Sequence, residues 1–241
     1  MTNAGSAEPR QVQPHRGWYS RGYLPHADFP GLVQMITYRL ADSLPAGALN
    51  RISHELRLIP KQRQEVEKRR RIEEWLDAGH GCCVLRQPAA AECVVKTWPR
   101  FAGERYDLIA WVLMPNHVHV LIRVYERISL GRMVQSWKSY TGRRIAELGL
   151  GAPGLAAPMG DGTATSPWMR DCWDRFIRDE KHFRAAVEYI HGNPVKARLV
   201  NNPEDWPWSS ASDWDLALAR SEPLDPMQGT AGPLPKLPCP R

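Results

Sequence analysis

The hydrophobic pattern changes its period several times along the chain, and these changes predict the secondary structure. Residues 32–40, 106–114 and 117–124 are apolar and β-branched runs typical of strands. Apolar positions spaced three or four apart predict helices over 46–78 (broken at Pro60), 89–100, 129–148 and 180–191. A short strand is predicted over 82–86, and a strand or ordered loop over 168–178. This order predicts an α+β fold, an antiparallel β-sheet with helices packed on it.

The ends of the chain differ in composition from its middle. Residues 1–17 are polar and residues 216–241 are rich in proline, so both predict disordered tails around one domain over 18–215. Glycine, alanine and proline dominate residues 149–166, which predicts a mobile loop without secondary structure of its own.

Charge and cysteine content narrow the class of protein. The 241 residues carry a formal net charge of +6, which favours a polyanionic partner such as nucleic acid. The five cysteines include no CxxC pair, which argues against a cysteine zinc site and for free thiols in a reducing compartment. The N-terminal stretch has no apolar core and no run is long enough to cross a bilayer, so we expect a cytoplasmic protein.

Two histidines are the first candidates for chemistry. In a strand, His117 and His119 point to the same face because only Val118 separates them. Two neighbouring imidazoles can supply two nitrogen ligands to one divalent metal ion. The alternative is a pair of ordinary strand histidines, and the HxH pattern alone does not decide between them.

A tyrosine on the following predicted helix is a candidate nucleophile. Tyr140 could be a core residue, or its hydroxyl could face the two histidines. A phenol is a poor nucleophile at neutral pH, and a metal that polarises a phosphate oxygen would help it. Arg143 or Arg144 could stabilise the negative charge of the transition state.

Four separated motifs then resemble one family. MPNHVHVLI, SWKSYTGRRI, WDRFIRDEKHFRAAVEYIHGNPVKARLV and PEDWPWSS occur in the order seen in the REP-associated tyrosine transposases, relatives of the HUH single-strand transposases of small insertion sequences. The resemblance runs from about Gly17 to about Ser212. It implies a ferredoxin-like HUH endonuclease core, His117 and His119 as ligands of Mg²⁺ or Mn²⁺, and Tyr140 as nucleophile.

The resemblance also implies a reaction and a partner. Single-stranded DNA carrying a hairpin would be cleaved and rejoined through a 5′-phosphotyrosine intermediate. The expected enzyme is a monomer, with a homodimer as the alternative. In insertion-sequence relatives a glutamine or asparagine one helical turn after the tyrosine completes the metal site, but here that position is Arg144, which cannot ligate. Glu147, Asn116 or water would have to replace it. Two alternatives therefore stay open, a hairpin-binding protein with a degraded metal site and a hydrolytic metal-dependent nuclease.

Basic residues in or beside these motifs are candidate DNA contacts, each with an alternative as an ordinary surface charge. The candidates are Arg21, Lys138, Arg143, Arg144, Arg175, Arg178 and Lys196. The run Lys68–Arg71 is flanked by glutamates, so it predicts either an ion-paired helix face or a further DNA contact.

Overall fold

The computed structural model describes residues 15–20, 25–126, 128–150, 157–158 and 165–213. Both predicted disordered tails lie outside these residues, except for 15–17. The strands are β1 (Gly17–Ser20), β2 (Pro25–Asp28), β3 (Val33–Arg39), β4 (Tyr106–Leu113), β5 (His117–Val124), β6 (Ala157–Pro158), β7 (Thr165–Ser166) and β8 (Trp173–Phe176). The α-helices are α1 (Ala48–Leu56), α2 (Lys61–Asp77), α3 (Pro88–Val95), α4 (Leu130–Glu147) and α5 (Glu180–Lys196).

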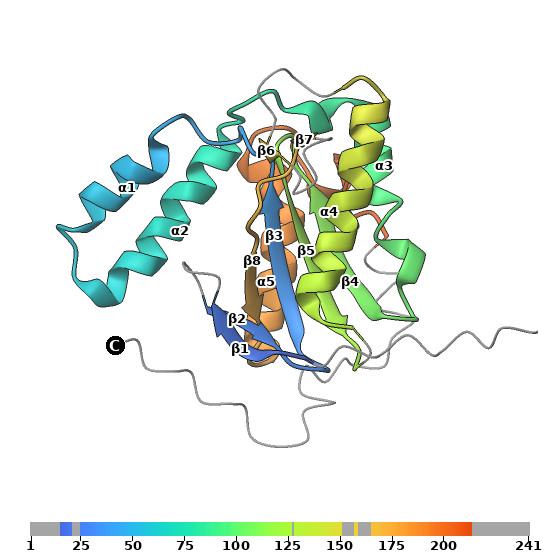
Figure 1. Ribbon diagram of the computed structural model, residues 1–241, viewed down its shortest axis with the longest axis horizontal. Helices are drawn as coiled ribbons and strands as arrows, with labels where there is room; N and C mark the ends of the chain where they lie inside the picture. The colour runs from blue at the N-terminus through green and yellow to red at the C-terminus, as the bar shows by residue number, and fades with distance from the viewer. Residues whose placement is uncertain (1–14, 21–24, 127, 151–156, 159–164, 214–241) are drawn as a thin grey trace, which may run out of the picture.

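The main sheet confirms the predicted α+β class. Its strand order is β4-β5-β3-β8, and every neighbouring pair is antiparallel. Along the chain these strands and two helices follow one another as β3, α3, β4, β5, α4 and β8, which is the ferredoxin-like arrangement. Figure 1 shows α1 and α2 as an arm that projects from this core, inserted between β3 and α3.

The two faces of the sheet carry different layers. Val118 and Val120 of β5 point toward α3 and α4, in a core that includes Trp137 of α4. Leu121 points the other way and packs with Phe183 and other apolar residues of α5. The period-two alternation of β5 therefore separates an α3–α4 side from an α5 side, and Figure 1 shows α4 and α5 on opposite sides of the strands.

Helix α5 is longer than the sequence pattern predicted. The predicted helix ended at residue 191, but α5 continues through Pro194 to Lys196. Pro194 removes the backbone donor that would bond to the Ile190 carbonyl, but the helix continues past it, and the Ala197 amide still donates to the Asn193 carbonyl at 2.9 Å. The helix therefore includes Asn193 and Lys196, on the side of the sheet that bears Leu121.

Two other expectations need correction, and one strand pairing was not predicted. Residues 84–86 form a 3-10 turn rather than a strand. Within the predicted unstructured loop, Ala157–Pro158 pairs with Thr165–Ser166 as a two-stranded ladder. The pairing of β1 with β2 was not predicted, because GWYSRGYLPH lacks an apolar alternation long enough to indicate strands. Ser129, the first residue of the predicted helix, caps α4, and its hydroxyl accepts a hydrogen bond from the Arg132 amide at 3.4 Å.

Candidate active site and metal centre

The two histidines lie on the α5 side of the sheet. His117 pairs in register with Arg39 of β3, and His119 pairs with Thr37, so both imidazoles share the face that bears Leu121. Each side chain is about 1% exposed. Their ring centroids are 4.9 Å apart. The predicted shared face is confirmed, and the imidazoles are close enough for one ion to touch both.

Hydrogen bonds leave the outer nitrogen of each ring available. Asn116 donates its Nδ2 to the His80 carbonyl at 3.0 Å, which leaves its Oδ1 to accept from His117 Nδ1 at 2.8 Å. Nδ1 of His119 lies 2.7 Å from the Thr37 hydroxyl. When Nδ1 is held in this way, the lone pair for a metal is on Nε2. Among the described residues, Nε2 of His119 is buried and has no hydrogen-bond partner.

A tyrosine of α5 lies beside these imidazoles. The ring of Tyr189 is 5.2 Å from that of His119, with the planes at 74°. Its side chain is partly buried against the α5 core. Its hydroxyl is buried and forms no hydrogen bond with any of the described residues. The motif WDRFIRDEKHFRAAVEYIHGNPVKARLV thus places a phenol next to the paired histidines.

One helical turn later, Asn193 supplies a free oxygen. Its side chain is about 1% exposed, and its Nδ2 donates to the Tyr189 carbonyl at 3.4 Å. Its Oδ1 is buried without a partner in the described part of the chain. A buried amide oxygen without a hydrogen bond is costly, and a cation would satisfy it.

Helix α2 of the arm brings acidic groups to the same place. Asp77 forms an ion pair with Lys196 of α5 at 2.8 Å, and the Lys196 ammonium lies 5.9 Å from the centre of the Tyr189 ring. Glu73 lies one turn before Asp77. Burial raises the pKa of Tyr189, and the negative charge of Glu73 raises it further. Burial also raises the pKa of Glu73, with Lys196 acting against that shift.

The imidazoles are held neutral. Burial lowers the pKa of His119 to about 3, and the positive charge of Lys196 acts in the same direction. Burial also lowers the pKa of His117 well below its usual value, with the charges of His119, Lys196 and Arg39 adding to the effect. A neutral imidazole is the form that binds metal.

Tyr140 does not lie with the histidines, so the prediction that its hydroxyl faces them is wrong. Helix α4 packs on the valine face of β5, and the imidazoles point to the other face. The Tyr140 side chain is 42% exposed. The sheet itself stands between this phenol and the histidine pair.

Neither Glu147 nor Asn116, the two side chains considered as a third ligand, is placed to act as one. Arg144 and Glu147 form an ion pair with each other on exposed α4, on the valine side of the sheet. The Asn116 oxygen is engaged by His117, so Asn116 orients a ligand rather than acting as one. The described residues hold no group of three His, Cys, Asp or Glu side chains that could bind a metal. Asn193, one helical turn after Tyr189, has an unpaired buried oxygen on the same side of the sheet as the two imidazoles.

These donors fit a divalent cation. His117, His119 and Asn193 offer two imidazole nitrogens and one amide oxygen, and two of these three atoms are buried and unpaired. Imidazole is unusual for Mg²⁺, which prefers oxygen, so the mixed set suits Mn²⁺ better. Water or a phosphate oxygen would complete the coordination.

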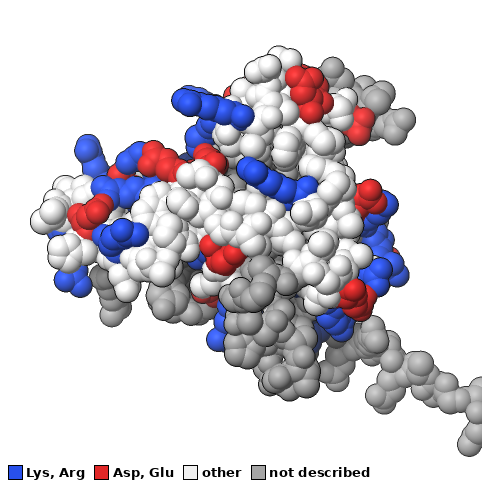
Figure 2. All heavy atoms as spheres, turned by 90° about the horizontal axis from the view of Figure 1, so that it is seen from above, with Lys and Arg blue, Asp and Glu red and all other residues white. Residues whose placement is uncertain are grey.

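The candidate DNA contacts divide between the two sides of the sheet. Arg175 of β8 is paired with Met35 of β3, so both side chains point to the same face of the sheet. Partial burial lowers the pKa of Arg175, and the nearby charges of Arg69 and Arg178 lower it further. Lys196 lies on this side of the sheet too, because it is the last residue of α5. By contrast, Arg143 is exposed on α4, and the Lys138 ammonium donates to the Arg170 carbonyl at 2.7 Å. Arg21 lies outside the described residues. The face in Figure 2 mixes basic and acidic side chains and shows no continuous basic field.

Comparisons with known proteins agree with the family resemblance. Residues 96–149 match the family model described as "Transposase IS200 like". A REP-associated tyrosine transposase of Escherichia coli K12 is 30% identical over 105 residues, which are 44% of this chain and 54% of that protein. A protein of Haemophilus influenzae with the same family name is 24% identical over 110 residues, covering 44% and 58%. The chain thus spans little more than half the length of these curated relatives.

A solved structure, described as a REP-associated tyrosine transposase bound to a REP hairpin, aligns with a TM-score of 0.46 and 19% identity, covering 83% of this chain and 88% of that one. The resemblance to REP-associated tyrosine transposases is confirmed by the family-model match and the curated relatives. The family-model match ends before α5, so it does not reach Tyr189 or Asn193. No helix among the described residues has the length and apolar character needed to cross a membrane.

Proposed function

We propose that the protein is a metal-dependent DNA strand transferase of the HUH tyrosine type, with Tyr189 rather than Tyr140 as nucleophile. The observation that carries this proposal is the cluster of His117, His119, Tyr189 and Asn193 on one side of the sheet, with unpaired buried atoms on three of them. The proposed substrate is single-stranded DNA that carries a hairpin, as the resemblance implies.

The three ligands would hold Mn²⁺ or Mg²⁺ through His117 Nε2, His119 Nε2 and Asn193 Oδ1. When bound, the ion supplies Lewis-acid polarisation of a phosphate oxygen. Asn116 and Thr37 keep the two rings in the orientation that presents Nε2.

Tyr189 carries the covalent step. Its Oη attacks the scissile phosphorus, the bond from phosphorus to the 3′ oxygen breaks, and the 5′ phosphate remains on the tyrosine. The phenol proton passes to the Glu73 carboxylate, and the departing 3′ oxygen takes a proton from solvent. The raised pKa of Tyr189 makes an acceptor necessary, and the raised pKa of Glu73 makes its carboxylate a stronger base.

The covalent intermediate preserves the energy of the phosphodiester. A free 3′ hydroxyl can attack the phosphotyrosine, release Tyr189 and rejoin two strands without ATP. This reaction distinguishes strand transfer from a hydrolytic nuclease, in which water is the attacking group and no adduct with the protein forms.

A hairpin-binding protein without activity is the second candidate. The feature that had favoured it was Arg144 in place of a ligand, and this support is removed because Asn193 stands one turn after Tyr189. The proposal is tested by incubating the protein and Mn²⁺ with labelled oligonucleotides that carry a hairpin and randomised single-stranded flanks. We expect a labelled band at the mass of a protein–DNA adduct on a denaturing gel. Cleavage without an adduct would indicate hydrolysis, and binding without cleavage would indicate the inactive binder.

A further inference from the structure

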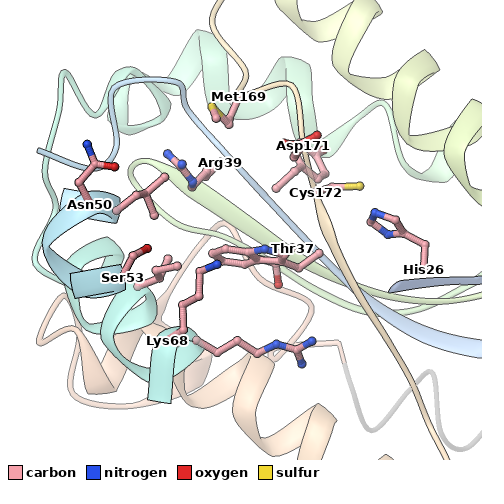
Figure 3. A pocket seen from close by; sticks show the side chains of 14 residues that line it. His26, Thr37, Arg39, Asn50, Ser53, Lys68, Met169, Asp171 and Cys172 are labelled. Atoms are coloured by element: carbon pink, nitrogen blue, oxygen red, sulfur yellow. The ribbon is translucent and has the colours of Figure 1, made fainter. Parts of the chain in front are cut away.

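A cleft lies between the arm and the end of the sheet that adjoins the histidines. It has a volume of about 330 Å³. Helices α1 and α2 form one wall, and residues of β3 and the segment before β8 form the other. Figure 3 shows Asn50, Ser53 and Lys68 on the arm side and Arg39, Met169 and Asp171 across from them. A volume of this size is at the lower end of the range for small-molecule sites and suits one nucleotide.

The arm is tied at its base, so the cleft exists before any ligand binds. The Cys82 amide donates to the Asp42 carboxylate at 2.7 Å, which joins the two chain segments where the arm leaves and re-enters the core. Gly81 lies in this contact with a φ of 87°, and an added Cβ would come within 2.6 Å of the Asp42 carbonyl oxygen. The ion pair of Asp77 with Lys196 holds α2 to α5. These contacts fix the arm against both β3 and α5.

A buried cation forms the floor of the cleft. Arg39 is 8% exposed, and its guanidinium donates to the Leu40 carbonyl at 3.3 Å and to the Ser43 hydroxyl at 3.0 Å. Within the described residues it forms no ion pair, although Asp171 is near enough to act on it electrostatically. A buried charge without a paired anion is costly, and a phosphate would supply the anion. Lys68 and Arg69 add two partly exposed cations on the α2 side.

Other groups that line the cleft are suited to a base. Asn50 offers an amide donor and acceptor, Ser53 a hydroxyl and Asp171 a carboxylate, all of which can pair with the edge of a base. Ile72 and Trp173 supply apolar and aromatic surface for a ring to pack on. The cleft thus combines cations with polar groups and aromatic surface, and together these match a phosphate joined to a base.

The cleft is next to the candidate metal centre. Thr37 lines it and also contacts Nδ1 of His119, and Thr37 is paired with Trp173 on one side and His119 on the other. Because neighbouring strands lie about 4.8 Å apart, Trp173 and His119 are about 10 Å apart across the sheet. A DNA strand that passes over the histidines would place a nucleotide one or two positions away into the cleft.

We propose that this cleft binds one unpaired nucleotide of the DNA strand beside the scissile phosphate and selects its base. Arg39, Lys68 and Arg69 receive the phosphate, and Asn50 and Ser53 contact the base edge. This inference rests on the proposed function for the identity of the strand. It makes the cleft side of the arm a specificity device, formed by residues other than Glu73, the α2 residue that accepts the proton in the proposed covalent step.

The test is a sequence selection on the full chain. Hairpin oligonucleotides with randomised single-stranded flanks are bound to the protein, and the bound fraction is separated on a native gel and sequenced. We expect the wild type to prefer one base at one flank position by about tenfold. In the double variant Asn50→Ala/Ser53→Ala this preference falls below about twofold while preferences at other positions remain. Both side chains are exposed, and unfolding curves confirm that the variant is folded.

A second variant tests the phosphate part of the cleft. Lys68→Ala is expected to weaken binding of all sequences by about three- to tenfold and to lower the salt dependence by about one counterion. Lys61→Ala is the matched control, an exposed lysine on the same helix that does not line the cleft, and His54→Ala is the control on α1. If Lys61→Ala weakens binding as much as Lys68→Ala, the phosphate assignment is overturned.

The outcomes separate this inference from the proposed function. A wild type that forms the DNA adduct, with a base preference that survives Asn50→Ala/Ser53→Ala, overturns the cleft assignment alone. A wild type that shows the preference, loses it in the double variant and forms no adduct overturns strand transfer, and supports the cleft as a nucleotide contact. Loss of the preference in His54→Ala as well as in the double variant overturns the assignment, because the effect would then belong to α1 generally.

Discussion

Helices α4 and α5 have nearly the same length, 18 and 17 residues, and each carries a tyrosine, yet the sheet separates them. Helix α4 buries Trp137 and Met133 against the valine face of β5 and leaves Tyr140 exposed. Helix α5 packs against the other face and brings Tyr189 to His119. A candidate nucleophile is therefore identified by the face of the sheet that its helix covers, and not by its distance from the histidines in sequence.

The largest expected effect is a complete loss of protein–DNA adduct formation. Tyr189→Phe removes the attacking oxygen and keeps the ring against His119, so we expect no protein–DNA adduct on a denaturing gel with labelled hairpin oligonucleotides and Mn²⁺. Tyr140→Phe is the matched control on α4 and should form the adduct at the wild-type rate. An adduct that persists in Tyr189→Phe and disappears in Tyr140→Phe would reverse the roles of the two helices.

The second prediction concerns Glu73 of α2, the helix of the arm that packs next to α5. Glu73→Gln keeps the size of the side chain and removes its ability to accept the phenol proton, so the rate of adduct formation at pH 7 should fall by about 10²- to 10⁴-fold. The substitution also removes a negative charge that raises the pKa of Tyr189, which by itself would increase the rate. Single-turnover kinetics of adduct formation show which of these two opposing effects on the rate is larger. A faster variant would show that Glu73 opposes ionisation of Tyr189 and is not its base.

For α4 the expected effect is on stability. Trp137 is 2% exposed, and its Nε1 donates to the Tyr106 hydroxyl at 3.2 Å. Trp137→Ala should therefore lower the free energy of unfolding by about 3–5 kcal/mol in denaturant titrations. Because α4 takes no part in the proposed metal centre, the folded variant should bind Mn²⁺ like the wild type. A large loss of metal affinity in folded Trp137→Ala would contradict the division of roles between α4 and α5.

The sequence predicted much of this arrangement and missed its decisive residues for identifiable reasons. The alternation in β5 correctly placed His117 and His119 on one face, and the helical period correctly placed the buried side of α4. An amphipathic helix indicates which of its own sides is buried, but it does not indicate which face of a sheet it covers. That choice depends on long-range packing, and Tyr140 was assigned to the wrong side of the sheet.

The proposed third ligand, Asn193, was missed for a local reason. Asn193 precedes a proline, and a proline usually ends a helix, so the predicted helix stopped at residue 191. With the helix ended there, the spacing of four residues did not place Tyr189 and Asn193 on one face of a helix. The signal was nevertheless present, since YIHGN places an amide one turn after a tyrosine, which is the pattern that Tyr140 and Arg144 lack.

A histidine on each side of the sheet should contribute to stability with an opposite dependence on pH. His119, on the α5 side, has a pKa of about 3 in the folded chain against about 6.5 when unfolded. Between these values the unfolded chain binds a proton that the folded chain does not, so stability falls as pH falls. In metal-free buffer, His119→Gln should reduce the loss of unfolding free energy from pH 7 to pH 4 by about 3 kcal/mol.

On the α4 side, His15 gives the contrast. Its Nδ1 lies 2.9 Å from the Asp28 carboxylate, which also accepts from the Leu130 amide at the start of α4. The hydrogen bond with Asp28 raises the pKa of His15, so its contribution is present below the unfolded pKa and is lost as pH rises through the folded value. In His15→Gln the fall of stability with acid should be steeper than in the wild type. Equal pH profiles for the two variants would contradict the opposite environments.

The smallest effect concerns the metal alone. Asn193→Ala removes one proposed ligand and leaves both imidazoles, so the Kd for Mn²⁺ measured by calorimetry should rise by about 100-fold, at least as much as loss of an orienting contact costs. Arg144→Ala is the control on α4 and should leave the Kd unchanged, because its guanidinium pairs with Glu147 on the far side of the sheet. Thr37→Val, which removes the contact with Nδ1 of His119, should fall between them, at about tenfold. If Asn193→Ala binds Mn²⁺ like the wild type while His119→Gln does not, the third donor is water, and the role of α5 is limited to presenting Tyr189.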